Sequence, residues 1–399
     1  MDPVETLRSR LHDRAAWAVF ADWLTTHGDP TGELCALELQ KPADRSRILE
    51  LKRQRVEGRG GWHPLDVKVA QSDLINATWF AGHLEAVELQ NPWEGSAADE
   101  LRAALEAPCG RFLRALILSQ HYPDDVSMGA HGQHGEWEWA ADALLSLGAP
   151  SLTELTLGSR DSEQLEFAEG SNSMVTTTRP RTPGGRIIRP SRWIGDVQPL
   201  FAKFPSLRRL ELRGEGVRLS ELPARLERLV VRGRFVRAST LQSIGATPLP
   251  DLSHLVLWPG HWPDSAPHFE PPEPELFYGR ATSEADLAAL LTGQHVPKLK
   301  NLAVSNSSWT AAFLAALAES PLAAQLEWLD VHNGLLDERD VDQLVRLAPR
   351  LRHLQWFDLS RHRIVDPEAQ ARLKAAFGEG LVLGEQFVPE PDPLVAFFS

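Results

Sequence analysis

The chain repeats one pattern of hydrophobic and polar positions, in which leucines are spaced as L-x-x-L-x-L. Most copies are followed by a polar or Gly/Pro turn and then by a helical pattern, such as the segment EADLAALLTG that begins at Glu284. Alternating apolar positions predict a short strand, and the pattern after the turn predicts a helix. Each copy therefore predicts a strand–turn–helix unit. Nine copies occur, and they begin at Leu84, Leu113, Leu152, Leu207, Leu226, Leu252, Leu299, Leu326 and Leu351.

Such units must stack on one another, because one unit cannot bury its own apolar face. From residue 84 to about residue 383, the chain resembles the leucine-rich repeat family. The resemblance implies an α/β leucine-rich-repeat solenoid with a curved parallel sheet and helices on its convex side. The asparagine that usually follows the strand in this family is mostly missing, and Asn306 and Asn333 are the nearest matches. We therefore expect less regular turns after the strands.

The first 60 residues carry a different, purely helical pattern. From Val19 to Gln40, two short amphipathic segments flank the turn THGDP, and a third helix is expected at about 42–57. The motifs ADWL, GDP and LELQ in this stretch resemble the small helical repeat-companion domain that precedes leucine-rich repeats in some bacterial proteins. The resemblance implies an N-terminal α-helical cap over the apolar edge of the first strand, with Trp23 at the junction. Its expected core comprises Trp17, Phe20, Trp23, Leu24, Leu34 and Leu37.

These patterns divide the chain into regions. Three intervals between repeats are longer than the roughly 20–29 residues of one such repeat, and each carries its extra residues directly after a strand. We therefore expect the insertions on one rim of the sheet, where a solenoid can elaborate loops that carry function. The regions are a helical repeat-companion domain (1–60), a connector (61–83), the repeats (84–383, with insertions at 120–138, 159–192 and 259–280) and an apolar C-terminal tail (384–399).

Strand alternation predicts which side chains the sheet exposes when the leucines point inward. The middle strands then expose basic residues, and the later strands expose large aromatics and histidines. The planar guanidinium of Arg can bond a carboxylate or phosphate bidentately, although a solvated face balanced by nearby glutamates is the alternative. The candidate partner-binding residues are Arg209, Arg213, Arg228, Arg232, His254, Trp258, Trp262, Trp328, Asp330, His332 and His353, together with Arg181, Arg186 and Arg189 of the second insertion.

Three of these candidates, Trp258, Trp262 and Trp328, are predicted on the concave face or its rim. Monomers seldom expose large apolar groups in clusters unless a partner covers them. The aromatic residues therefore predict a protein partner, and the arginines predict that its surface is acidic. The sequence does not identify this partner or the oligomeric state.

The composition narrows the class of partner. The chain has 41 Lys and Arg residues against 54 Asp and Glu residues and a net charge of −13, which disfavours general binding to nucleic acid or to an anionic membrane. The N-terminus lacks an apolar signal-peptide core, and no run of about 18 apolar residues could span a bilayer. Only Cys35 and Cys109 are present, so a disulfide framework is excluded. We therefore expect a cytoplasmic protein that contacts neither membrane nor nucleic acid.

Strong signatures of catalysis or cofactor binding are missing from the sequence. It has no phosphate-binding loop, no dinucleotide fingerprint and no G-x-S-x-G, H-E-x-x-H or C-x-x-C motif. The first insertion gathers His, Asp and Glu side chains that are competent for zinc, but flexible glycines separate them. We predict a non-catalytic protein–protein interaction module or scaffold, with no cofactor and no metal. Two alternatives stay open: an inhibitor or immunity protein that sequesters a toxin or enzyme, and a metal-dependent hydrolase that uses residues 121–138.

Overall fold

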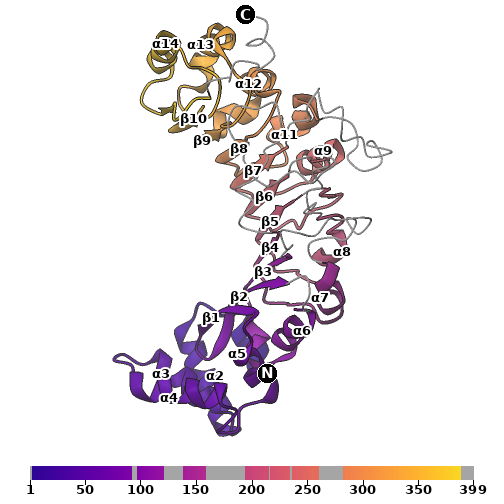
Figure 1. Ribbon diagram of the computed structural model, residues 1–399, viewed down its shortest axis with the longest axis vertical. Helices are drawn as coiled ribbons and strands as arrows, with labels where there is room; N and C mark the ends of the chain where they lie inside the picture. Colours follow the sequence, from indigo (N-terminus) through magenta and orange to yellow (C-terminus); the bar gives the residue numbers. More distant parts are fainter. Residues whose placement is uncertain are drawn as a thin grey trace, which may run out of the picture. The chain divides into compact units, whose positions relative to one another are not determined.

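A computed structural model describes residues 2–91, 97–120, 138–158, 194–214, 216–233, 236–259 and 282–387 of the 399-residue chain. It divides into two compact units, each with its own strands and helices (Figure 1). Unit 1 comprises Met1–Val126, Gly135–Gly158 and Pro199–Leu207, and unit 2 comprises the other segments, chiefly Arg208–Ser399. The strands follow one another in the order of the sequence, β1 to β4 in unit 1 and β5 to β11 in unit 2. Within the described ranges, no helix has both the length and the apolar character needed to cross a membrane.

Unit 1 begins with helices that aspartates cap. The side chains of Asp2, Asp13, Asp29 and Asp44 accept hydrogen bonds from backbone N–H groups in the first turns of α1 to α4. These caps satisfy donors that a helix start otherwise leaves without partners. The described elements are α1 (Pro3–Arg8), α2 (Arg14–Thr26), α3 (Pro30–Leu39), α4 (Arg45–Val56), α5 (Pro64–Gln71), β1 (Ile75–Phe80), β2 (His83–Asn91), α6 (Ala98–Glu106), η1 (Pro108–Phe112), β3 (Ala115–Gln120), η2 (Glu138–Ala140), α7 (Ala141–Leu147) and β4 (Glu154–Leu157), and α8 (Gln198–Phe201) follows in the chain.

The first two strands form an antiparallel hairpin. Its two-residue turn consists of Ala81 and Gly82, whose φ angles of 50° and 76° are those of a tight turn that matches the twist of the strands. A Cβ atom on Gly82 would lie 2.8 Å from the Thr31 side chain of α3, so glycine also permits this close approach. The predicted connector 61–83 thus contains a helix, α5, and a strand, β1, neither of which was predicted from the sequence. From β2 onward the strands of unit 1 pair in parallel.

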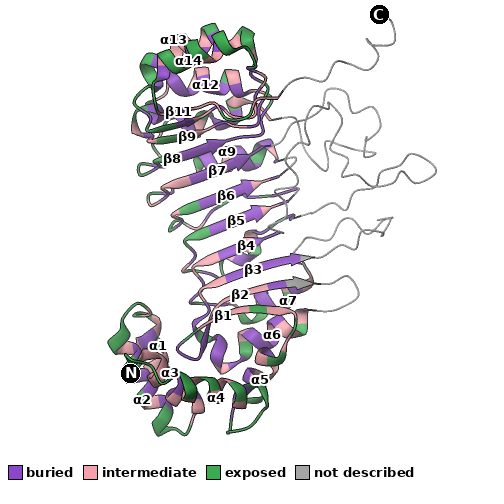
Figure 2. Ribbon diagram, turned by 60° about the vertical axis from the view of Figure 1, so that its left-hand side comes forward, coloured by how far each residue is buried: buried purple, intermediate pink, exposed green. Residues whose placement is uncertain are grey.

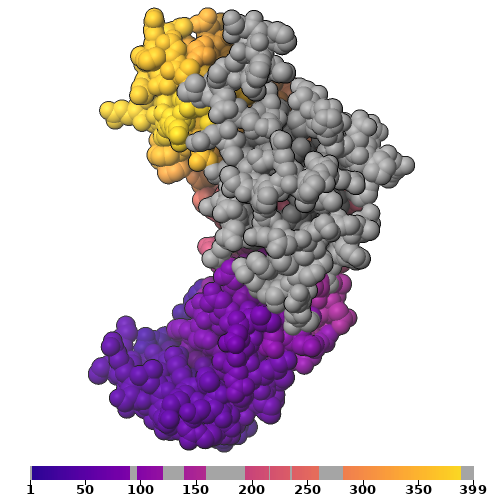
Figure 3. All heavy atoms as spheres, viewed as in Figure 1, coloured from indigo at the N-terminus to yellow at the C-terminus, as the bar shows by residue number. Residues whose placement is uncertain are grey.

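The core of unit 1 lies between the helices and the hairpin. Trp17 and Phe20 of α2 are almost fully buried and make edge-on contacts with Phe112, at centroid separations of 5.3 Å for both pairs. Trp23 is only partly buried and stacks on Phe20 at the edge of this cluster. The expectation that Trp23 fills the junction was wrong, because the helix turns Trp17 rather than Trp23 toward the strands. Figure 3 shows these helices and the first strands, coloured indigo to purple, as one closely packed body.

Unit 2 repeats a parallel strand and a helix several times. Each described strand buries at least one apolar side chain, and successive helices contact one another as a second layer (Figure 2). The elements are β5 (Arg209–Arg213), β6 (Arg228–Arg232), α9 (Ala238–Ala246), β7 (His254–Trp258), η4 (Glu284–Leu287), α11 (Ala288–Leu291), β8 (Asn301–Val304), α12 (Thr310–Ala318), η5 (Pro321–Gln325), β9 (Trp328–Asp330), η6 (Glu338–Asp340), α13 (Val341–Leu351), β10 (Trp356–Asp358), α14 (Pro367–Phe377) and β11 (Leu381–Val382). This mixed α/β arrangement is compatible with the predicted repeat solenoid.

The ninth repeat lies three residues later than the sequence motif predicted. Leu351, which begins that motif, is the last residue of α13, and the strand begins only at Trp356. In the strand, Phe357 pairs with Leu329 of β9 and is 1% exposed. The true apolar positions are therefore Leu354, Phe357 and Leu359, and a phenylalanine takes the place of the central leucine. The leucine pattern does not identify this strand, because the core accepts the ring of Phe357 in place of a leucine.

The turns after β8 and β9 contain the two asparagines that the sequence singled out. Asn306 and Asn333 have φ angles of 57° and 60°, in the left-handed region that asparagine tolerates better than most residues. Both are buried, and Nδ2 of Asn333 donates a hydrogen bond of 3.2 Å to Oδ1 of Asn306. A short asparagine ladder therefore joins these two repeats. At the equivalent position of the next repeat, Arg361 adopts the same backbone conformation.

Candidate functional site

The strand register of unit 2 aligns one side chain from each of β5 to β10 in a row across the sheet. Adjacent strands lie about 4.8 Å apart, so neighbouring side chains of such a row can contact one another. We call this set the Arg–Trp row. It consists of Arg209, Arg228, His254, Asn301, Trp328 and Trp356.

Two arginines that were predicted to be exposed form one end of the Arg–Trp row. Arg209 and Arg228 are paired in register on adjacent strands, and both are exposed. This end of the row therefore presents two guanidinium groups on a protein whose net charge is negative.

His254 continues the row as a neutral hydrogen-bonding group. Nδ2 of Asn301 can only donate and lies 3.0 Å from Nε2 of His254, so this nitrogen accepts. The proton is then on Nδ1, which lies 2.8 Å from the hydroxyl of Ser253. Partial burial lowers the pKa of His254, and the charges of Arg228 and Arg209 lower it further. At neutral pH the positive charge at this end therefore comes from the arginines.

The other end of the row is a pair of stacked tryptophans. Trp328 and Trp356 are 45% and 38% exposed, their ring centroids lie 5.3 Å apart and their planes differ by 17°. Parallel pairing of β9 and β10 places the two residues directly opposite each other. Trp328 was predicted to be exposed, but Trp356 was missed because the ninth motif had been placed in the wrong frame. The sequence does contain a signal for Trp356: it directly precedes Phe357, an apolar residue that can take the place of the central leucine.

At the carboxyl ends of β5 to β7, the predicted site residues contact one another. Trp258 is only 6% exposed, and the guanidinium carbon of Arg232 lies 4.5 Å from its ring centroid. The ring also meets His332 edge-on at 5.5 Å. The prediction that Trp258 is an exposed apolar group was therefore wrong: cation–π and aromatic contacts integrate it into the folded structure.

One ion pair and one histidine–carboxylate pair lie close to this aromatic contact. Nη2 of Arg213 lies 2.7 Å from Oε1 of Glu211, and Nδ1 of His332 lies 2.6 Å from Oδ1 of Asp330. Burial acts to raise the pKa of Asp330, but hydrogen bonds from His332 and Ser305 and the charge of His332 bring it below its ordinary value. Asp330 therefore stays ionised. These residues hold the sheet surface in one arrangement beside the exposed row.

Comparisons with known proteins inform the fold. No family model matches the chain, and no curated protein matches it. A crystal structure of a protein from Bacteroides fragilis is similar, with a TM-score of 0.55, 17% sequence identity and coverage of 77% of each chain. At this level of identity the likeness shows a shared fold alone.

Strand alternation does not determine how far a side chain is exposed. It would place Val230 of β6 and Ser305, just after β8, on the same face as the candidates, yet both are fully buried. His353 was also misplaced, because it follows α13 in a turn and Nε2 lies 3.0 Å from the carbonyl oxygen of Ala323. The residue that pairs with Trp328 on the next strand is Trp356. Alternation fixes where a side chain points, whereas exposure depends on what its neighbours cover.

Several predicted residues lie outside the described part of the chain. They are Trp262, Arg181, Arg186, Arg189 and the His/Asp/Glu segment at 121–138, of which only the backbone of Glu138 is described. Among the residues that the structure does describe, no group of three or more His, Cys, Asp or Glu side chains could hold a metal ion.

Proposed function

We propose that the chain is a leucine-rich-repeat protein with an N-terminal helical cap, and that it binds a protein partner through the Arg–Trp row. The repeat assignment is supported by nine copies of the leucine pattern and by parallel strands in sequence order. The buried contacts of Trp17 and Phe20 with Phe112 support the cap assignment. The scaffold would then serve to hold the row rigidly.

The exposed stack of Trp328 and Trp356 carries the proposal. Large aromatic side chains dominate the energetics of protein interfaces, because they bury much apolar area and lose little conformational freedom. Two indoles held in one stacked arrangement by β9 and β10 need no further ordering when a partner arrives. The stack therefore suits an apolar side chain at the centre of an interface.

The arginines of the same row define the charge of the partner. The exposed Arg228, with Arg209 beside it on the neighbouring strand, would pair with a carboxylate of the partner. Because they lie in one row with the tryptophans, a single segment of a partner can meet both ends. The partner is thus a protein with an acidic group and an apolar group presented on the same surface.

The experiment begins with capture of the partner from lysate and its identification by mass spectrometry. The dissociation constant of the purified pair is then measured calorimetrically for Trp356→Ala and for Arg228→Glu. We expect each substitution to weaken binding about tenfold or more, as truncation of a central interface residue typically does.

Two matched substitutions away from the row serve as controls. Leu49→Ala removes an apolar side chain that is 67% exposed on α4, and Arg346→Glu reverses an exposed charge on α13. Both are expected to leave the affinity unchanged. Equal affinities of the wild type, Trp356→Ala and Arg228→Glu would contradict the proposed binding site.

A further inference from the structure

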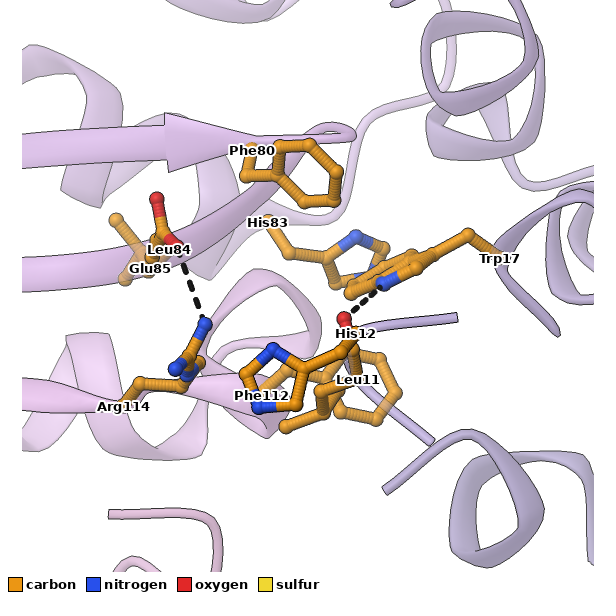
Figure 4. A pocket seen from close by; sticks show the side chains of 9 residues that line it. All are labelled: Leu11, His12, Trp17, Phe80, His83, Leu84, Glu85, Phe112 and Arg114. Carbon is orange, nitrogen blue, oxygen red and sulfur yellow. Dashed lines mark hydrogen bonds and ion pairs between the residues drawn. The ribbon is translucent and has the colours of Figure 1, made fainter. Parts of the chain in front are cut away.

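Unit 1 contains a cavity that is separate from the Arg–Trp row. It encloses about 230 Å³ between the helices and the first strands (Figure 4). Pockets for drug-sized ligands usually span roughly 300–1,000 Å³, so this one suits a smaller group. Most of its wall is apolar or aromatic, and the residues that line it are Leu11, His12, Trp17, Phe80, His83, Leu84, Glu85, Phe112 and Arg114.

Aromatic rings form the inner wall of this cavity. Trp17 meets Phe80 and Phe112 edge-on, at centroid separations of 5.4 Å and 5.3 Å. Phe80 is 43% exposed and thus borders the opening. Glu85 and Arg114 lie together on another side, where their side chains approach to 3.4 Å, as the dashed line in Figure 4 marks. Edge-on contacts are the favoured geometry between aromatic rings, so the wall can accept one further ring.

His83 supplies a polar atom to this aromatic wall. It is 3% exposed, and its Nδ1 lies 2.9 Å from the carbonyl oxygen of Ala81. A carbonyl oxygen can only accept, so Nδ1 carries the proton and Nε2 has a lone pair. Among the described residues, no hydrogen-bond partner of Nε2 is found. Nε2 is not fully buried, and because His83 lines the cavity, a donor that enters the cavity can reach this nitrogen.

The neutral state of His83 is secured by its surroundings. Burial lowers its pKa to about 4, against smaller raising effects of the Ala81 carbonyl and Asp29. The charges of Arg111 and Arg55 lower it further. At neutral pH the ring is therefore an acceptor at Nε2.

We propose that this cavity binds one aromatic ring that carries a hydrogen-bond donor, a phenol such as the side chain of tyrosine. The ring packs edge-on against Trp17 and Phe112, and its hydroxyl donates to Nε2 of His83. An unsubstituted aromatic ring fills the same space but leaves the acceptor without a donor. Selectivity for the phenol over its deoxy analogue is thus the property that distinguishes this site from an apolar gap.

The test compares p-cresol with toluene. We expect p-cresol to bind saturably in the millimolar range, as befits so few atoms, and toluene to bind about five- to tenfold more weakly, the effect of one buried hydrogen bond. Binding is measured by calorimetry and by the ring-nitrogen NMR signals of 15N-histidine-labelled protein, in which the Nε2 signal of His83 shifts with p-cresol only. Equal affinities for the two ligands, or no saturable binding, would overturn the proposal.

Two variants keep the test informative if one of them disturbs folding. His83→Phe removes the acceptor and should bring p-cresol down to the affinity of toluene. Phe80→Ala opens the wall at an exposed position and should weaken both ligands to a similar extent. A melting curve establishes that each variant is folded. If p-cresol remains the stronger ligand in folded His83→Phe, the hydroxyl does not bind His83 and the proposal fails.

A third arm distinguishes the two sources of a phenol. N-acetyltyrosinamide carries the tyrosine ring with a flanking backbone on each side. Binding of this probe with the affinity of p-cresol or better supports a tyrosine of a partner protein. Binding of p-cresol alone supports a small free phenol instead. Since the cavity and the Arg–Trp row share no residue, failure here leaves the proposed partner-binding function untouched.

Discussion

At the scale of single residues, His362 is a buried hydrogen-bonding link between neighbouring repeats. It is fully buried, its Nε2 donates to the carbonyl oxygen of Val331 at 2.8 Å, and its Nδ1 accepts from the backbone N–H of Leu336 at 3.2 Å. Since both nitrogens are occupied, the neutral ring fits its site and the protonated ring does not. Burial accordingly lowers the pKa of His362 from 6.5 to about 4.

This lowered pKa makes the stability of unit 2 sensitive to acid. Above about pH 6.5, His362 is neutral in both the folded and the unfolded state, and its contribution is constant. Between about pH 6.5 and pH 4, only the unfolded state takes up the proton, so the free energy of unfolding should fall by about 3 kcal/mol. Below about pH 4 this loss levels off. When unfolded in a calorimeter at pH 5, the His362→Gln variant should take up about one proton fewer than the wild type. Equal proton uptake by the two proteins would contradict the lowered pKa of His362.

Trp17 and Trp23 lie on the same helix but differ in what they support. Trp17 is 3% exposed, and its Nε1 donates to the carbonyl oxygen of Leu11 at 2.9 Å. We expect Trp17→Ala to cost about 3–5 kcal/mol of unfolding free energy, as removal of a buried aromatic does. Trp23→Ala, at the edge of the cluster, should cost about 1–2 kcal/mol. Chemical denaturation of both variants measures the difference, and a larger loss in Trp23→Ala would refute this ranking.

At the scale of elements, one arginine ties helix α4 to the first hairpin. The guanidinium carbon of Arg55 lies 3.9 Å from the ring centroid of Trp79 in β1 and 5.1 Å from that of Trp62. Its Nη1 donates to the carbonyl oxygen of Gly82 at 3.0 Å. A planar guanidinium can stack on indoles and hydrogen-bond at its edge at the same time. Arg55 thus joins α4 to β1, to the hairpin turn and to the segment before α5.

The geometry of this contact predicts that lysine cannot replace Arg55. The compact ammonium of Arg55→Lys cannot cover both indoles while it reaches Gly82, so we expect a loss of about 2–3 kcal/mol. Arg59→Lys, at an exposed position just after α4, should change the unfolding free energy by no more than about 0.5 kcal/mol. The two midpoints in urea provide the measurement. If the variants are equally stable, Arg55 does not hold the hairpin.

The sequence predicts the strands that carry the leucine motif and fails at the strands that lack it. Leucine spacing placed β2 to β9 correctly, because each motif buries its leucines in the parallel register. It failed at β10, where Phe357 fills the central position and the spacing continued falsely from the end of α13. It also missed β1, because a hairpin strand that alternates between intermediate and exposed residues carries no leucine motif.

In the candidate site, the sequence predicts which residues are exposed better than which are buried. The exposed arginines of β5 and β6 and the exposed Trp328 follow from alternation alone. The burial of Trp258 does not, because it depends on Arg232 of the neighbouring strand and on His332 two strands further along. Such contacts join residues that are distant in the sequence, and a periodic pattern contains no information about them. The acceptor of His83 is hidden for the same reason.

At the scale of the whole molecule, the charge of the Arg–Trp row opposes that of the chain. The net charge is −13, yet Arg209 and Arg228 lie side by side. An acidic partner is repelled by the protein as a whole and attracted by this row at short range. Short-range attraction survives in moderate salt better than long-range repulsion does, because the Debye length is about 10 Å at 0.1 M and about 3 Å at 1 M.

This opposition predicts how the affinity for the partner depends on salt. Raising NaCl from about 50 mM to about 500 mM should weaken binding several-fold in the wild type, because the arginine–carboxylate contacts are screened. In Arg209→Ala with Arg228→Ala, the same increase should leave the affinity unchanged or strengthen it, because only the repulsion is left to be screened. Titrations at three salt concentrations test both chains. A parallel salt dependence in the two would exclude the arginines from the interface.

The stacked pair in the Arg–Trp row also gives the protein an optical signature. Two indoles at 5.3 Å and nearly parallel are close enough for their electronic transitions to couple, which produces a paired positive and negative band in the far-ultraviolet circular dichroism spectrum. The coupling exists only while β9 and β10 stay in register. Subtracting the spectrum of Trp356→Phe from that of the wild type therefore isolates a reporter of one strand junction from among 13 tryptophans, so that opening of this end can be followed without a label.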